Sequence, residues 1–151
     1  MVAIVSISIA ALVGFSAYII TSMNYGKEGN IALNITNIKS TEGSIRVAIF
    51  QDEKSFKKEK PAKHITVPKS NIEDNSVSVS FYLQPGTYGI SVLDDANNNG
   101  KMDYNFIGVP KEGFGFADYF HGGLSRPKFE DFQFIIGEDE KLNMTSKFRY
   151  M

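Results

Sequence analysis

Oxygen-bearing side chains recur at short intervals in residues 95–103, which read DANNNGKMD. Calcium takes six to eight hard oxygen ligands, so side chains spaced in this way can converge on one ion while Gly100 lets the chain turn sharply. The spacing therefore predicts a calcium site with a structural role. Its expected ligands are four side chains and one main-chain carbonyl: Asp95, Asn97, Asn99, Asp103 and, through its carbonyl, Lys101.

The same stretch departs from an EF-hand loop. Its twelfth position, Phe106, carries no ligand oxygen, and no helix pattern flanks the stretch. A carboxylate from elsewhere would have to complete the ligand shell, and the candidates are Asp94, Glu112 and Asp118. The competing interpretation is a tight turn in which the Asn and Asp side chains bond to their own backbone. Calcium is the preferred prediction because the spacing match is complete.

Three aromatic residues further along the chain are candidates for binding an organic ligand. Phe114 and Phe116 are separated by Gly115, so both side chains fall on the same side of an extended segment, and Tyr119 follows. The preferred interpretation is that these rings close one end of the protein core. The alternative is an exposed platform for a sugar ring or for a strand of a partner protein.

The motifs do not favour catalysis. His121 lies near Asp118 and is followed by two glycines, but no nucleophile elbow, zinc-protease motif or Cys/His set accompanies it. His64 is expected at the surface or at a strand edge. We therefore predict a protein that is not an enzyme, and keep as an alternative a small hydrolase that uses His121 and the nearby carboxylates.

Composition limits the class of protein. The chain has 151 residues, which suits one domain. It has 16 Lys and Arg against 17 Asp and Glu, so no overall electric field favours nucleic acid as a partner. Cysteine is absent, which excludes disulfide bonds and thiolate metal sites.

The N-terminal segment differs from the rest of the chain. The first charged side chain is Lys27, and residues 2–20 are apolar except for serines and one glycine, long enough to cross a bilayer. We expect residues 1–26 to be a signal peptide or an uncleaved membrane anchor, with a buried element of the domain as a third interpretation. The first two interpretations place residues 27–151 outside the cytoplasm as one domain.

The apolar period after residue 30 is two, which is typical of half-buried strands. The expected strands lie near 31–38, 44–51, 63–67, 76–83, 87–94, 129–136 and 142–150. This pattern predicts an all-β fold, an antiparallel β-sandwich of about seven strands, immunoglobulin-like or transthyretin-like.

Three connections are predicted between these strands. A type II turn at Pro85-Gly86 would join 76–83 to 87–93 as a hairpin. The charged residues 53–60 form an exposed loop or a single helical turn, with a solvated loop favoured over a basic binding patch. Residues 94–128 form a long, glycine-rich connection, and loops of this length in compact domains are usually functional or disordered. Its interleaved aromatic residues favour a functional loop.

The central block of the chain resembles the DUF2141 family of uncharacterised bacterial exported proteins. The matching segments are Pro85-Gly86-Thr87-Tyr88, DDANNNGKMD at 94–103, NFIGVP at 105–110, KEGFGF at 111–116 and PKFED at 127–131. The resemblance covers residues 31–150 and implies a secreted or periplasmic β-sandwich with no established activity. Ala117-Asp118 stands where Ser-Asn is usual, and Arg126-Pro127 replaces a double proline.

These observations together predict an extracytoplasmic, calcium-stabilised binding or structural module. Its ligand is unknown, with carbohydrate or protein as the candidates, and its contact with a membrane would be only through residues 1–26 if they are not cleaved. The alternative is a membrane-anchored cell-envelope protein that acts through protein contacts.

Overall fold

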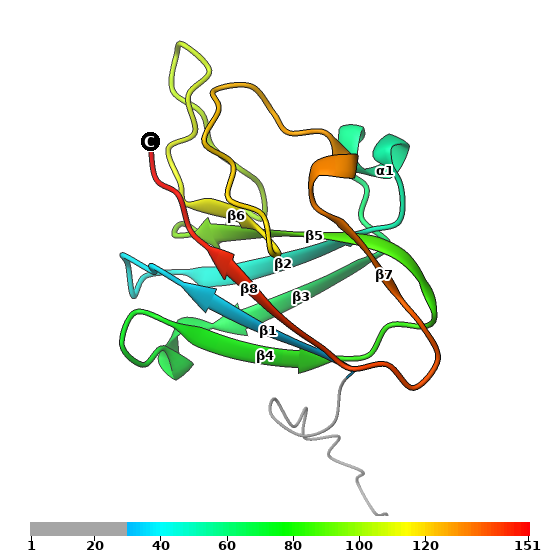
Figure 1. The fold of residues 1–151 in the computed structure, drawn as a ribbon. Helices are drawn as coiled ribbons and strands as arrows, with labels where there is room; N and C mark the ends of the chain where they lie inside the picture. Colours follow the sequence, from blue (N-terminus) through cyan, green and yellow to red (C-terminus); the bar gives the residue numbers. More distant parts are fainter. Residues whose placement is uncertain (1–29) are drawn as a thin grey trace, which may run out of the picture.

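The computed structural model describes residues 30–151, and the predicted leader at 1–26 lies outside them. Figure 1 shows two facing β-sheets, with a short helix and long loops on one side. The elements are β1 (Ile31–Thr36), β2 (Ser44–Phe50), α1 (Glu53–Lys57), β3 (Lys63–Pro68), β4 (Val77–Phe81), β5 (Gly86–Asp95), β6 (Phe114–Phe116), β7 (Gln133–Ile136) and β8 (Leu142–Lys147). No helix among residues 30–151 is long and apolar enough to span a membrane.

The described chain is an all-β sandwich, as the sequence predicts. One sheet has the order β4-β1-β8 and the other the order β3-β2-β5-β6, with β7 also pairing with β5. The strand pairs are antiparallel except β1 with β8, which run parallel, so the prediction of a purely antiparallel sandwich is wrong for that pair. Strand β6 was not predicted because three residues are too short to show a periodic pattern.

Alternation along the strands builds the core between the sheets. Leu33 on β1, Val47 on β2 and Ile90 on β5 are fully buried, and they face one another across the sandwich with their neighbours at i±2. Burying a side chain of this size contributes about 1.5–3 kcal/mol. This core holds the two sheets together and fixes which face of β2 and β5 points outward.

The predicted hairpin at Pro85-Gly86 is wrong. Strand β4 pairs with β1 and strand β5 pairs with β2, so the chain crosses from one sheet to the other between them. The described glycines with positive φ are Gly43, Gly100 and Gly108, so Gly86 lacks the conformation that a type II turn requires. Alternation of apolar residues predicts which side chains face inward. It does not distinguish two strands paired in one sheet from two strands in opposite sheets, because both arrangements bury the same side chains.

Two further segments differ from the prediction in detail. Residues Phe129–Asp131 form a single 3-10 turn, and only the second half of the predicted strand at 129–136 is extended. The charged segment at 53–60 does form one helical turn. Asp52 begins this turn by accepting a hydrogen bond from the Ser55 N–H at 2.6 Å.

A second apolar cluster lies on the outer face of the five-stranded sheet. It consists of five buried phenylalanines: Phe50, Phe56, Phe116, Phe129 and Phe132. The Phe132 ring centroid is 4.7 Å from that of Phe116 and 4.9 Å from that of Phe56. These rings attach α1 and the 117–132 segment to the sheet, so this outer face is covered over part of its area.

A buried ion pair lies on the core side of β5. Lys69 and Asp94 form a salt bridge whose side chains are 1% and 2% exposed. The Tyr150 hydroxyl donates to the second Asp94 oxygen at 2.5 Å, and Lys69 also donates to the Glu42 carbonyl. Burial raises the pKa of Tyr150, and its hydrogen bond to Asp94 adds to this effect. Both oxygens of the Asp94 carboxylate are therefore occupied by partners on the core side.

Candidate functional site

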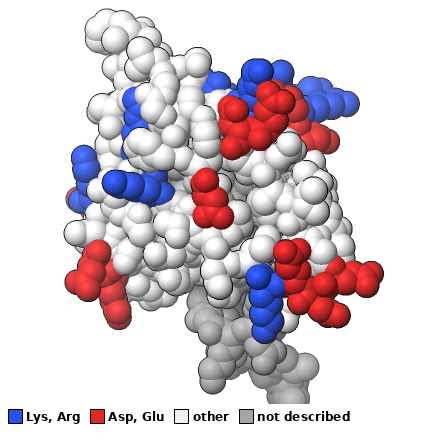
Figure 2. Space-filling view, in the orientation of Figure 1, with Lys and Arg blue, Asp and Glu red and all other residues white. Residues whose placement is uncertain are grey.

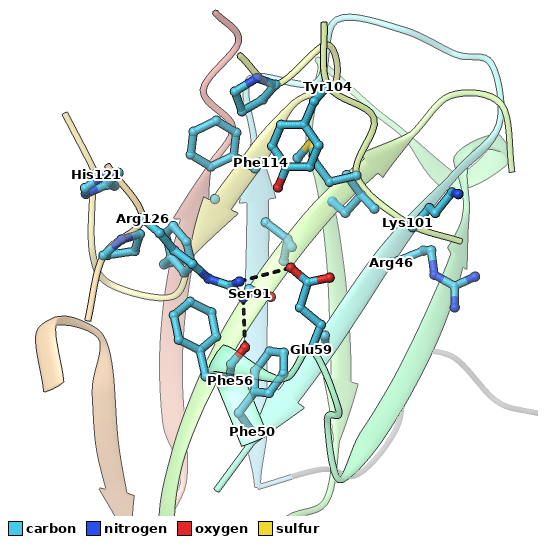
Figure 3. A pocket seen from close by; sticks show the side chains of 18 of the residues that line it. Arg46, Phe50, Phe56, Glu59, Ser91, Lys101, Tyr104, Phe114, His121 and Arg126 are labelled. Atoms are coloured by element: carbon cyan, nitrogen blue, oxygen red, sulfur yellow. Dashed lines mark hydrogen bonds and ion pairs between the residues drawn. The ribbon is translucent and has the colours of Figure 1, made fainter. Parts of the chain in front are cut away.

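A groove of about 530 Å³ lies on the outer face of the five-stranded sheet. In Figure 3 it runs between α1 and the loops that follow β5 and β6. Volumes of 300–1,000 Å³ are usual for small-molecule sites, so the groove has the size of a ligand pocket. It is the candidate functional site.

The floor of the groove is made by two rows of side chains that cross the sheet. Strand pairing places Ala48 of β2 opposite Ser91 of β5, and Ser91 opposite Phe116 of β6. In the next row, Arg46 lies opposite Leu93, and Leu93 opposite Phe114. Side chains directly opposite on one face are neighbours. Ala48 and Ser91 are small, which is why the sheet surface is hollow between the larger side chains around them.

The walls are loops that are fastened to the sheet by charged side chains. Arg126 donates to a Glu59 carboxylate oxygen at 3.0 Å and to the Phe56 carbonyl at 2.8 Å, as the dashed lines in Figure 3 mark. Its guanidinium also lies 4.2 Å from the centroid of the Phe56 ring. On the other side of the 117–128 loop, Arg149 donates to the carbonyls of His121 and Gly123. These contacts hold the loop beside the groove.

Cationic side chains line the other side of the groove. Arg46 projects from β2 and Lys101 from the loop after β5, and Figure 3 shows them on the same side, away from His121 and Arg126. Arg46 is half-buried and makes no hydrogen bond or ion pair with any of the described residues. Partial burial lowers the pKa of His64, and the nearby Arg46 charge lowers it further. On this side of the groove, Arg46 therefore carries a positive charge with no ion-pair partner among residues 30–151.

The predicted aromatic residues lie in or beside the groove. Phe114 and Phe116 line it, with Phe114 half-buried and Phe116 only 6% exposed. Tyr119 does not line it, because its ring packs against Phe116 at 6.4 Å and against His121 at 6.0 Å. All three rings belong to the outer aromatic cluster or pack against it, and none lies in the core between the two sheets.

The predicted calcium ligands converge around one carboxylate. Asp103 Oδ2 accepts hydrogen bonds from the amide nitrogens of Asn97 at 2.7 Å and of Asn99 at 2.8 Å. Asp95 is fully buried, and its two oxygens accept the N–H groups of Asn99 and Gly100. These contacts bring together the four side chains expected from the spacing. The two bonds to Asp95 are also side chain to backbone bonds of the kind that the competing interpretation of a tight turn predicts.

Of the three candidates for a completing carboxylate, Glu112 lies at this loop. It accepts the N–H groups of Ala96 and Asp103, both at 3.2 Å. Burial is the main cause that raises its pKa, and the charges of Asp103 and Asp95 contribute to the rise. Within residues 30–151, no three His, Asp or Glu side chains are grouped as a metal site by themselves, so amide and carbonyl oxygens would have to supply ligands.

The other two candidate carboxylates are engaged elsewhere. Asp94 faces the core and its ion pair with Lys69, because consecutive residues of a strand point to opposite faces. Asp118 accepts the Thr145 N–H at 2.8 Å. His121 has its own partners, the Ser125 carbonyl at one ring nitrogen and the Tyr119 hydroxyl at 3.4 Å at the other. The structure thus gives Asp118 and His121 separate structural contacts.

Several groove residues were not found from the sequence. Arg46, Ser91 and Arg126 come from parts of the chain that only the β2–β5 pairing and the loop contacts bring together. One signal was present in β2, where the outward positions include Ala48 and Phe50 rather than polar residues. The second half of this strand is therefore apolar on both faces, which indicates that something covers the outer face there.

An all-β protein with two facing sheets and a groove on one outer face is the class that the structure defines. The family model described as "Uncharacterized protein conserved in bacteria (DUF2141)" matches residues 33–144, so the chain belongs to this family. Comparisons with curated proteins and with solved structures gave no match.

Proposed function

We propose that the protein is an extracytoplasmic, non-enzymatic binding module that takes a small molecule in the groove on its five-stranded sheet. The observation that carries the proposal is the hollow over Ala48 and Ser91, bordered by aromatic side chains and by charged residues from two loops. A purely structural sandwich has no need for a depression of this size on a solvent-facing surface. Pockets with an apolar lining and a few polar groups are the usual sites for small ligands.

Filling the floor of the groove tests this proposal. Ser91→Trp places a large ring where the strands carry a small side chain, while the backbone pairing of β5 is kept. The uncharged fluorescent probe N-phenyl-1-naphthylamine should bind the unmodified protein saturably. Its dissociation constant should rise at least tenfold in the variant.

The matched control is Ser78→Trp, which places the same ring on the exposed outer face of the three-stranded sheet. This variant should bind the probe as the unmodified protein does. Absence of saturable binding to the unmodified protein, or equal weakening in both variants, would overturn the proposal of a groove ligand.

Calcium bound by the 95–103 loop is a second part of the proposed function. Asp95, Asn97, Asn99 and Asp103 are close enough to share one ion, and the carbonyl of Lys101 and the Glu112 carboxylate are the further oxygen donors. Binding would require the two amide groups to turn their oxygens toward the ion. An ion here would stabilise the loop that carries Lys101 into the groove lining.

Thermal melts in millimolar calcium and in chelator test the calcium site. Binding to the folded state alone contributes about 2.7 kcal/mol when the free ion is a hundredfold above its dissociation constant. That corresponds to a melting temperature higher by several degrees. Asp103→Asn should remove the shift because it removes a charged ligand, while Lys101→Ala should keep it because only the carbonyl is used. An unmodified protein whose melting temperature ignores calcium would show that the loop is only a turn.

The compartment and the leader belong to the same proposal. The apolar residues 2–20 support export, either as a signal peptide or as an anchor, and family membership is compatible with both. An immunoglobulin-like or transthyretin-like sandwich would suit such a module, because it stays stable without disulfide bonds. Mass spectrometry of the mature N-terminus after expression in a bacterial host distinguishes cleavage from anchoring, and retention in the cytoplasm would refute export.

A further inference from the structure

We infer that the ligand of the groove is an anion with an apolar, planar body, its charged group bound by Arg46 and Lys101 and its body lying toward the aromatic side chains of β6. This inference rests on the proposed function, because it requires that the groove takes a small molecule. It adds the chemical class of that molecule.

The charges that line the groove do not balance. The side chains of its lining include three full cations, Arg46, Lys101 and Arg126, against one side-chain carboxylate, Glu59. Glu59 is paired with Arg126 at 3.0 Å, so it does not neutralise the other two. Positive charge that lines a groove attracts anions more strongly than the same charge on a flat surface.

Arg46 is the cation best placed to bind a ligand directly. It is half-buried on the sheet, and an added side-chain carbon on Gly100 would lie 3.4 Å from its Nη1 atom. The loop after β5 therefore packs closely against the guanidinium and shields it partly from water. No described residue gives it a hydrogen bond or an ion pair, although a guanidinium can bind a carboxylate or phosphate through two parallel hydrogen bonds.

The lining changes from charged to apolar across the sheet. Arg46 lies on β2, its neighbour across the strands is Leu93 on β5, and the next residue in the same row is Phe114 on β6. Adjacent strands are about 4.8 Å apart, so the Arg46 and Phe114 backbones are separated by about 10 Å. A ligand that spans this row meets a cation at one end and an aromatic ring at the other. An uncharged sugar would leave the guanidinium without a partner.

The opposite side of the groove does not repeat this arrangement. Arg126 already binds the Glu59 carboxylate, the Phe56 carbonyl and the face of the Phe56 ring. Its side chain therefore connects the 117–128 loop to α1 and to Glu59, the second residue after the helix. The two arginines therefore differ, because Arg126 is bonded to α1 whereas Arg46 has no hydrogen-bond partner among residues 30–151.

Two probes with the same body and different charge test the inference. The anion 1-anilinonaphthalene-8-sulfonate carries a sulfonate that N-phenyl-1-naphthylamine lacks. The unmodified protein should bind the sulfonate at least tenfold more tightly, and this preference should fall as sodium chloride is raised. Arg46→Gln should weaken binding of the sulfonate much more than binding of the uncharged probe, and so reduce the preference to less than threefold. Lys101→Gln should reduce it in part.

Two control variants test whether the loss of preference for the sulfonate is specific to the groove or follows from any change of surface charge or of exposed aromatic side chains. Lys54→Gln removes an exposed cation of α1 that does not line the groove, and it should leave both affinities unchanged. Phe106→Ser removes a ring that is 98% exposed at the tip of the 104–109 loop and should also change neither affinity. Each variant should melt cooperatively, which shows that the probes are not reporting unfolded protein.

The outcomes distinguish this inference from the proposed function. Binding of the uncharged probe without preference for the sulfonate, or equal weakening of both probes by Arg46→Gln, would overturn the anionic ligand and leave the groove as a binding site. Failure of both probes to bind would overturn the proposed function and this inference together.

Discussion

The outer faces of the two sheets differ in almost every respect. On the three-stranded sheet the outward residues are small and polar, such as Asn34, Ser78 and Thr145, and they are exposed to water. On the five-stranded sheet the same kind of face carries buried phenylalanines, a helix, two long loops and the groove. Both sheets contribute buried residues to one core, so packing between the sheets does not by itself account for the difference. It indicates that the inner faces form the core between the sheets, and that the aromatic cover and the groove lie on the outer face of the five-stranded sheet.

Charged side chains are unevenly distributed over the surface of the domain. In Figure 2 the charged side chains of the visible face lie mostly around its periphery, and the protruding loop at residues 104–109 carries none. That loop presents Phe106 and Ile107, which are 98% and 69% exposed. The tip of this loop is therefore apolar and exposed.

The largest expected effect comes from the rings that cover the five-stranded sheet. Phe132→Ala removes a ring that is 3% exposed and packs against Phe56, Phe116 and Phe129. Truncating a buried phenylalanine costs about 3–5 kcal/mol of the free energy of unfolding. Asn143→Ala, on the open face of the other sheet, should change it by less than about 0.5 kcal/mol. Urea denaturation measures both, and similar values would erase the distinction between the two faces.

A smaller effect is expected where a ring lies directly on the strand. Gly89 of β5 has no room for a side chain, because an added carbon would lie 2.6 Å from the Phe132 ring and 2.7 Å from the Phe129 ring. Gly89→Ala should therefore cost about 1–3 kcal/mol through overpacking. Gly122→Ala is the control, since an added carbon there has nothing within 4 Å. If both substitutions are neutral in thermal melts, the aromatic cover is loose rather than packed.

The smallest effect should come from the groove itself. Arg46→Gln removes a cation that has no partner among residues 30–151, so the free energy of unfolding should stay within about 0.5 kcal/mol of the original value. The same substitution should have a large effect on binding of the anionic probe. A decrease in the free energy of unfolding above 1 kcal/mol would mean that Arg46 stabilises the fold. The proposed difference between the stabilising aromatic cover and the groove would then be wrong.

The strands were predictable because their inner faces alternate. The strands β1, β2, β3 and β8 all begin within one or two residues of the predicted starts, and the alternation of burial is clearest in β1 and β8. Partners were not predictable from the same signal, which is why β4 and β5 were wrongly joined as a hairpin. Alternation states which residues are buried and leaves open on which side of the core each strand lies.

The site was predictable only where its residues are close in sequence. The side chains of Asp95, Asn97, Asn99 and Asp103 do converge, because local spacing within one loop largely determines their geometry. The groove depends on β2, β5 and β6 lying side by side, and on Arg126 reaching α1. Arg46 and Ser91 look like ordinary outward residues of two strands until this pairing is known.

The two adjacent carboxylates at the end of β5 lie on opposite faces of the sheet and therefore have different contacts. Asp94 points inward to Lys69 and Tyr150, and Asp95 points outward to hold the loop backbone at Asn99 and Gly100. A pattern of two adjacent acids in the sequence suggests a shared ligand set. Pleating of the strand sends them to opposite faces instead.

The entry to β1 and the groove lie on different sides of the domain. The described chain begins in the three-stranded sheet, with the Asn30 carbonyl bonded to the Leu142 N–H, whereas the groove opens on the far side of the other sheet. In Figure 1 the loops around the groove and the entry to β1 lie on opposite sides of the sandwich. Both sheets therefore lie between the groove and the point at which the described chain enters β1.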